Sequence, residues 1–255
     1  MNCIKIYLLS FLSLVIIASE LNAQFTENGR DKPVDGQILS GGLGYGYLRP
    51  FGDMADRYGN NLAFSVIGHY ITSRNAVFGA DFTYMFGDKV KEDVVAPFRS
   101  KEGYFLGDNG LAADLYLRQR GFTFTGQGGY LIPLSKKSRT GIMVLIGAGI
   151  LQHQVRILDD QNAVAQLRGD LRKGYDRLTR GFTLTQDIMY THLSSNHRIN
   201  IKLGLTCFQG WTGEVRAVNF DTGLPTISSR LDMGLGIKAV WMLPFYISAK
   251  ERVYY

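Results

Sequence analysis

Cysteine and proline are scarce in this sequence, and long hydrophobic runs are absent beyond its first 23 residues. The 255 residues include 2 cysteines and 6 prolines. Cys207 is the only cysteine after the N-terminal segment, which excludes an intramolecular disulfide and a zinc site of the Cys-x-x-Cys type. The longest later apolar run, Ile142–Leu151, has ten residues, whereas a membrane-spanning helix needs about 20. The chain is therefore not a helical membrane protein.

The first 23 residues have the pattern of a secretory signal peptide. Lys5 gives a short basic start, Ile6–Ala18 is an apolar run, and Leu21–Ala23 offers small or apolar residues for cleavage before Gln24. The apolar run is too short to span a membrane. A lipoprotein would carry a cysteine just after it, whereas Cys3 precedes it. We therefore expect an exported chain.

What the sequence does contain is glycine, aromatic residues and strict alternation. It has 30 glycines, 12% aromatic residues and a mean hydropathy of −0.03, a balance typical of transmembrane β-strands that alternate apolar and polar residues. We expect an all-β fold, an eight-stranded antiparallel transmembrane β-barrel with long extracellular loops. The alternative is a soluble sandwich or lipocalin-like barrel. The alternating segments are 37–48, 61–72, 76–86, 111–132, 141–157, 180–192, 199–211 and 231–243.

The fourth of these segments is the least regular. Leu115 and Leu117 share one parity with the residues before them, whereas Phe122 and Phe124 have the other parity. We expect a β-bulge at Arg118–Gly121, where the pattern changes.

The connections between the segments alternate between short and long, which is the outer-membrane pattern of periplasmic turns and extracellular loops. We therefore predict a bacterial outer-membrane protein with both termini in the periplasm. The short connections are 73–75, 135–140 and 194–198, and the long ones are 49–60, 87–110, 158–179 and 212–230. The expected organisation is a signal peptide (1–23), a periplasmic segment (24–36), the barrel (37–247) and a periplasmic tail (248–255).

Two groups of residues resemble known outer-membrane proteins. In the last segment, Gly234, Ile237 and Trp241 resemble the outer-membrane assembly signal, which implies the assembly machinery as a partner during biogenesis. The segment Gly174–Gly181, with the sequence Gly-Tyr-Asp-Arg-Leu-Thr-Arg-Gly, resembles a motif of small outer-membrane barrels of Bacteroidota. Leu151–Ile157 carries the same resemblance, which implies an OmpA- or OmpX-like barrel but no activity.

Five charged residues fall on the inward-facing, small-residue positions of the strands. Because eight strands enclose only enough space for side chains, we expect a lumen plugged by an ion network, with Lys202 and Lys238 pairing with Asp187 or Asp232. The alternative is a selective pore. The five residues are Asp81, Asp187, Lys202, Asp232 and Lys238.

The sequence contains only a weak match to a catalytic motif. The stretch His192–His197 is loosely similar to the His-x-Ser-Asn segment of lipid A deacylases, but Asn196 comes one residue late and no acid lies nearby. We expect no enzyme, cofactor or metal site, with a polar turn at this place.

The net charge of +6 does not indicate nucleic acid. Much of it falls on the predicted periplasmic turns and tail, where it would meet lipid phosphates. The expected partners are outer-membrane lipids, both phospholipid and lipopolysaccharide.

The two longest loops carry apolar and aromatic clusters, and exposed clusters of this kind often mark interaction sites. We therefore expect a non-enzymatic barrel that presents its loops to a protein partner, such as a secretion or outer-membrane assembly machine in which it is an accessory subunit. The alternatives are a lipid-modifying enzyme, a passive structural barrel, and loops that cover each other over the barrel mouth. The candidate interaction residues are Phe98, Tyr104, Phe105, Tyr175, Asp176 and Arg177.

Overall fold

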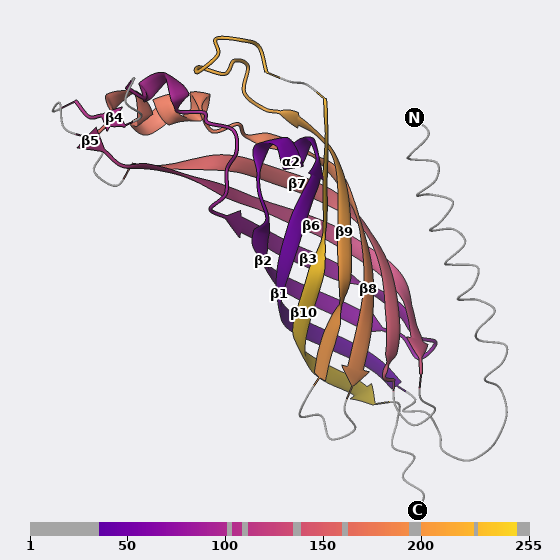
Figure 1. Ribbon diagram of the computed structural model, residues 1–255. Helices are drawn as coiled ribbons and strands as arrows, with labels where there is room; N and C mark the ends of the chain where they lie inside the picture. The colour runs from indigo at the N-terminus through magenta and orange to yellow at the C-terminus, as the bar shows by residue number, and fades with distance from the viewer. Residues whose placement is uncertain are drawn as a thin grey trace, which may run out of the picture. The chain divides into compact units, whose positions relative to one another are not determined.

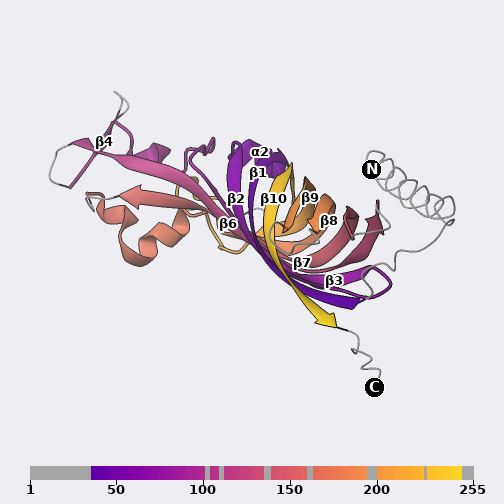
Figure 2. The same ribbon diagram turned by 90° about the horizontal axis from the view of Figure 1, so that it is seen from below.

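The computed structural model describes residues 36–100, 104–108, 112–134, 139–159, 163–193, 200–226 and 229–248. Eight antiparallel strands form a closed barrel in the order β1-β10-β9-β8-β7-β6-β3-β2 (Figures 1 and 2). The expected all-β, eight-stranded fold is thus confirmed. The strands are β1 (Gly36–Gly52), β2 (Asn61–Ile71), β3 (Ala76–Gly87), β6 (Leu115–Pro133), β7 (Gly141–Asp159), β8 (Thr179–Leu193), β9 (Asn200–Glu214) and β10 (Arg230–Ser248).

The four long connections leave the same end of the barrel, which we call the loop end; the opposite end is the turn end. They are L1 (53–60), L2 (88–114), L3 (160–178) and L4 (215–229). No helix in the described parts of the chain is long and apolar enough to cross a membrane. The short elements of the loops are α2 (Asp53–Arg57), η1 (Ala96–Phe98), β4 (Phe105–Leu106), β5 (Ala112–Ala113), η2 (Ala165–Leu167) and η3 (Gly169–Gly174).

At the turn end, β2 and β3 are joined by a tight turn at Asn75. This residue has a φ of 63°, in the left-handed region that asparagine tolerates better than most residues. The turn sets the register in which Ile71 pairs with Val77 and Leu62 pairs with Phe86. A short local signal therefore positions two complete strands.

The barrel wall has its large apolar side chains outside and its polar side chains inside. Leu43 and Tyr45 on β1 are 50% and 51% exposed, whereas Ser65, Thr125 and the other inward side chains at mid-barrel are buried. A water-soluble barrel would have the opposite distribution, because exposed apolar surface is costly in water. The outward face is that of a transmembrane β-barrel, with lipid as the neighbour of its apolar side chains.

The lumen is filled in three layers. Near the turn end, a buried apolar cluster closes the interior, and near the loop end a second apolar cluster lies under the long connections. Polar and charged side chains occupy the level between them. The turn-end cluster contains Ile38, Ile67, Ile71, Val77, Leu131, Met143, Leu145, Met189, Leu193, Val240 and Met242.

The expected bulge in the fourth strand is wrong. β6 pairs with β7 in one unbroken register, from Leu115 with Asp159 to Pro133 with Gly141. The apolar parity changes for a different reason. The partly buried Leu115 and Leu117 face inward at the loop end and pack on the apolar cluster there, whereas Phe124 is 51% exposed on the outward face. The apolar side chains of β6 thus face outward at mid-barrel and inward at the loop end, while the strand itself stays regular.

Candidate functional site

One chain of hydrogen bonds crosses the polar layer of the lumen through four strands. Lys202 Nζ on β9 lies 2.7 Å from His69 Nδ1 on β2, and His69 Nε2 lies 2.9 Å from Gln127 Oε1 on β6. Gln127 Nε2 donates to Asp187 Oδ2 on β8 over 2.8 Å. Because the lysine can only donate, His69 accepts at Nδ1 and donates from Nε2. The chain thus has one direction, from the ammonium group to the carboxylate.

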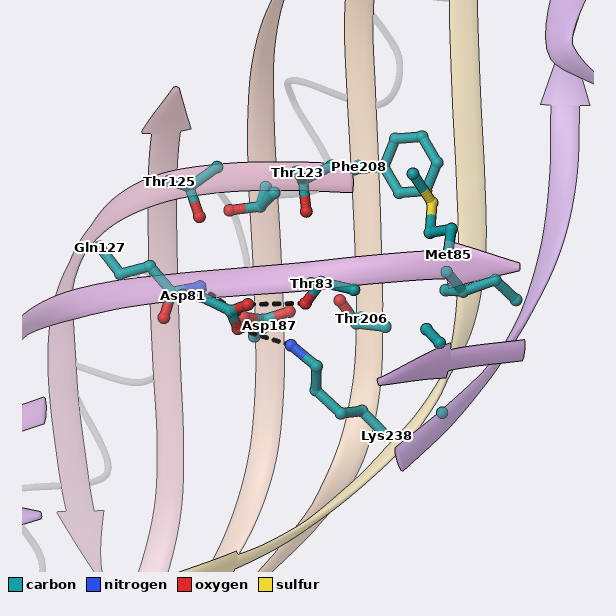
Figure 3. A pocket seen from close by; sticks show the side chains of 14 residues that line it. Asp81, Thr83, Met85, Thr123, Thr125, Gln127, Asp187, Thr206, Phe208 and Lys238 are labelled. Carbon is teal, nitrogen blue, oxygen red and sulfur yellow. Dashed lines mark hydrogen bonds and ion pairs between the residues drawn. The ribbon is translucent and has the colours of Figure 1, made fainter. Parts of the chain in front are cut away.

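A second network lies beside the first (Figure 3). Lys238 Nζ on β10 donates to Asp81 Oδ2 on β3 over 2.6 Å. Thr83 Oγ1 donates to the other oxygen of Asp81 over 2.6 Å and lies 2.7 Å from Ser65 Oγ. The cavity between these side chains holds about 20 Å³, enough for one water molecule. The polar layer is therefore packed with side chains.

The structure places all five predicted lumen residues in the interior, each at most 4% exposed. The expected pairing is wrong, however. Lys238 contacts Asp81 and Lys202 contacts His69. The strand tilt of a closed barrel brings together residues that are far apart along the sequence, so inward parity alone does not predict partners.

Asp232 belongs to a separate cluster near the loop end. Its Oδ2 lies 2.9 Å from His153 Nε2 and also accepts a hydrogen bond from Thr212 Oγ1. His153 Nδ1 in turn lies 3.2 Å from the hydroxyl of Tyr58, a fully buried residue of L1. Arg230 approaches the other oxygen of Asp232 at 3.4 Å. These contacts link the barrel wall to the first loop.

Five charged side chains connect the four long loops, and we call this set the cap network. Arg57 donates from Nε to Glu92 Oε2 over 2.6 Å and from Nη2 to Glu214 Oε1 over 2.5 Å. Arg177 donates from Nε to the other oxygen of Glu92 over 2.7 Å. It also holds both oxygens of Asp221, at 2.8 and 2.6 Å. The members are Arg57 in L1, Glu92 in L2, Arg177 in L3, Asp221 in L4 and Glu214 at the end of β9.

The charges of the cap network stabilise one another. Burial alone would raise the pKa of Glu92, but Arg57 and Arg177 outweigh it and hold this pKa below its ordinary value. Burial alone would lower the pKa of Arg177, but Asp221 and Glu92 raise it above its ordinary value. Glu92 and Arg177 are thus both charged at neutral pH.

Arg177 adopts an uncommon backbone conformation, with a φ of 49°. A residue other than glycine in this region is strained unless its surroundings determine it. Here the guanidinium makes three charged hydrogen bonds, and the carbonyl accepts bonds from Arg57 and Thr179. These contacts hold Arg177 in place.

The structure places three of the candidate interaction residues, Tyr175, Asp176 and Arg177, inside the loop assembly, where each is at most 9% exposed. Tyr175 lies between two aromatic rings, with centroid distances of 5.3 Å to Phe98 and 5.8 Å to Phe220. Asp176 accepts two hydrogen bonds from Arg216 in L4. These residues join loops to one another, which is the arrangement expected of loops that cover each other.

The three candidates in L2 are divided between core and surface. Phe105 is 5% exposed, with Arg99 stacked 4.4 Å from its ring centroid. Phe98 is partly buried against the same apolar cluster. Tyr104 is 45% exposed. The apolar clusters of L2 therefore supply most of their side chains to the core of the loop assembly.

The predicted assembly-signal residues lie on β10. Ile237 and Trp241 point outward and are 57% and 50% exposed. Gly234 faces inward, and a Cβ atom there would lie 2.3 Å from the ring of Phe208. The glycine leaves room for this buried ring.

Sequence reasoning missed His69, Gln127, Arg57 and Glu92 as network members. The inward parity of the first two was visible, but a lone histidine or glutamine signals nothing about its partner. His192 of the deacylase-like stretch is exposed at the end of β8, and residues 194–199 lie outside the described residues. No cluster of three potential metal ligands occurs in the described ranges.

No protein-family model matches this sequence, and no curated protein matches it. Similar solved structures include the attachment invasion locus protein Ail of Yersinia pestis, in complex with the heparin analogue sucrose octasulfate. It is 9% identical, with 81% of this chain and 99% of that chain covered and a TM-score of 0.42. Neisserial surface protein A is 7% identical, with coverages of 80% and 96% and a TM-score of 0.38. The outer membrane protein AlkL is 12% identical, with coverages of 90% and 99% and a TM-score of 0.35.

Proposed function

We propose that this chain is a non-enzymatic barrel of the bacterial outer membrane that presents a rigid loop surface to a protein partner. In this proposal residues 1–23 are removed on export, the turn end and both termini face the periplasm, and the loop end faces outward. An accessory role in a secretion or outer-membrane assembly machine fits such a surface. The observation that carries the proposal is the cap network, because it joins all four long loops into one unit.

A packed lumen supports a scaffold rather than a channel. The polar layer leaves about 20 Å³, and apolar clusters close the interior above and below it. A conducting pore would need a continuous aqueous path, which eight strands do not enclose.

Apolar side chains remain exposed on the outside of the loop assembly. Leu171 on η3 is 53% exposed, and Leu224 in L4 is 62% exposed. Both positions lie in the long loops, outside the strands of the barrel wall. Rigid loops lose little conformational entropy on binding, so apolar side chains mounted on them suit a protein interface.

The test is cross-linking in the native outer membrane, followed by mass spectrometry of the captured neighbours. The double change Leu171→Ser with Leu224→Ser should remove one or more specific neighbours and leave a heat-modifiable barrel. Leu134→Ser is the matched control, because Leu134 is also 62% exposed but lies at the turn end. An identical set of neighbours in all three strains would favour a passive structural barrel.

A further inference from the structure

A pocket of about 460 Å³ lies against the outer wall of the barrel, at the loop end. Its wall consists of outward-facing residues of β6 and β7, among them Arg120, Gln152 and Arg156, and its roof is η3 with Arg172 and Lys173. L3 therefore bends back over the outside of the barrel as well as over its mouth. None of the five cap-network residues lines this pocket.

The lining of this pocket is strongly basic. It contains four cationic side chains and one carboxylate. The carboxylate, Asp176, is already engaged by Arg216. Three of the four cations have weak or neutral partners: Arg120 and Arg172 donate to backbone carbonyls, and Lys173 pairs with the exposed Asp170. Such a lining attracts an anion.

The fourth cation, Arg156, stands in an unfavourable position without a ligand. In the register of β6 and β7, Arg156 lies directly opposite Arg118. Like charges in opposite positions destabilise a sheet. Arg118 has Asp88 at 3.3 Å, whereas Arg156 is exposed and, among the described residues, has no ion pair. An anion in the pocket would relieve this repulsion.

Aromatic rings line the side of the pocket that is nearer the middle of the barrel. Tyr84 and Phe122 line it, and each stacks on an aromatic neighbour, Phe86 and Phe82 respectively. Girdles of aromatic residues mark the level of the lipid headgroups on transmembrane barrels. The cations therefore lie just above the level at which acyl chains end.

We propose that this pocket binds a phosphate-bearing glycolipid of the outer leaflet. The arginines would take its phosphates, since guanidinium groups bind phosphate through paired charged hydrogen bonds. The side-chain amides of Gln152 and Gln154 can bond sugar hydroxyls, and Tyr84 and Phe122 can contact an acyl chain. The inference rests on the proposed function in one respect: the loop end must face the outer leaflet.

The experiment measures binding of diphosphoryl lipid A to the purified barrel in phosphatidylcholine nanodiscs by native mass spectrometry. The double change Arg156→Gln with Arg172→Gln should weaken binding by about tenfold or more, because two charged phosphate contacts are lost. Arg49→Gln with Arg74→Gln is the control. It removes the same charge from two exposed arginines outside the pocket and should leave binding unchanged.

Three outcomes would overturn the proposal. The first is equal lipid binding by the wild type and the pocket variant. The second is an equal loss in the control pair, since this would indicate a non-specific charge effect. The third is displacement of lipid A by inorganic pyrophosphate at equal concentration, which would point to a soluble phosphate ligand. The neighbours captured by cross-linking provide a separate readout, so failure of the lipid site and failure of the partner proposal are distinguishable.

Discussion

The lumen and the cap both contain buried charges, but they are built differently. In the lumen, Lys238 has one carboxylate partner and Lys202 has a neutral one, and every residue sits on a strand that the sheet already holds. In the cap, Arg57 and Arg177 each bridge two carboxylates, and all five residues stand at or beyond strand ends. The wall of a barrel positions its side chains through backbone hydrogen bonds. Loops lack that ladder, so forked guanidinium groups hold them together instead.

This difference predicts that the most destabilising substitution is one that breaks an ion pair in the lumen. Lys238→Met leaves the buried carboxylate of Asp81 without its counter-ion. The free energy of unfolding should fall by about 3–5 kcal/mol, because an uncompensated charge in a buried site is costly. The measurement is urea unfolding in lipid vesicles, followed by the fluorescence of Trp211 and Trp241.

The double change Asp81→Asn with Lys238→Met removes both charges and should restore most of that loss. If Lys238→Met alone had no effect, the lysine would have to face water or lipid rather than the lumen, and the contrast with the cap would fail.

A smaller and more local effect is expected in the cap. Arg177→Met removes the bonds that Arg177 in L3 makes to Glu92 in L2 and to Asp221 in L4. The cap should lose about 2 kcal/mol of local stability, a value typical of hydrogen bonds between charged groups and limited here because the side chain of Glu92 is 33% exposed. Trypsin should then cut faster at Lys173, while the barrel stays heat-modifiable.

Arg118→Met is the control for that change, because Arg118 pairs with the exposed Asp88 at the start of L2. It should leave cleavage at Lys173 nearly unchanged. Global unfolding of the Arg177 variant would show instead that cap and barrel form one cooperative unit.

The smallest effect is a pH dependence confined to the cap. The pKa of Glu92 in the folded protein lies below its ordinary value of 4.5. The stabilisation from its charge is therefore fully present above that value and is lost as the pH falls through the depressed pKa. Hydrogen exchange of L2 should be slower in the wild type than in Glu92→Gln at neutral pH, and this difference should vanish in acid. A difference that persists unchanged in acid would contradict the assignment.

The cap also shows where sequence reasoning reached its limit. The aromatic clusters of L2 and L3 were visible as apolar side chains in long loops, but the same pattern suits a docking surface and a packed core. Tyr175 is buried between Phe98 and Phe220, and the three residues lie in three different loops. Nothing local to any one of them specifies that arrangement.

The sequence by itself determined the eight strands, their antiparallel order, the alternation of short turns and long loops, and which positions face inward on every strand except β6. These are local properties, because parity along a strand and the residues of a turn act over only a few positions. The tertiary structure decided that Lys238 pairs with Asp81, that β6 needs no bulge, that Arg57 and Arg177 lock the loops, and that L3 roofs a basic pocket on the outer wall. Each of these depends on the tilt of the closed strands and on contacts between residues up to 157 positions apart, and no periodicity in the sequence encodes such distances.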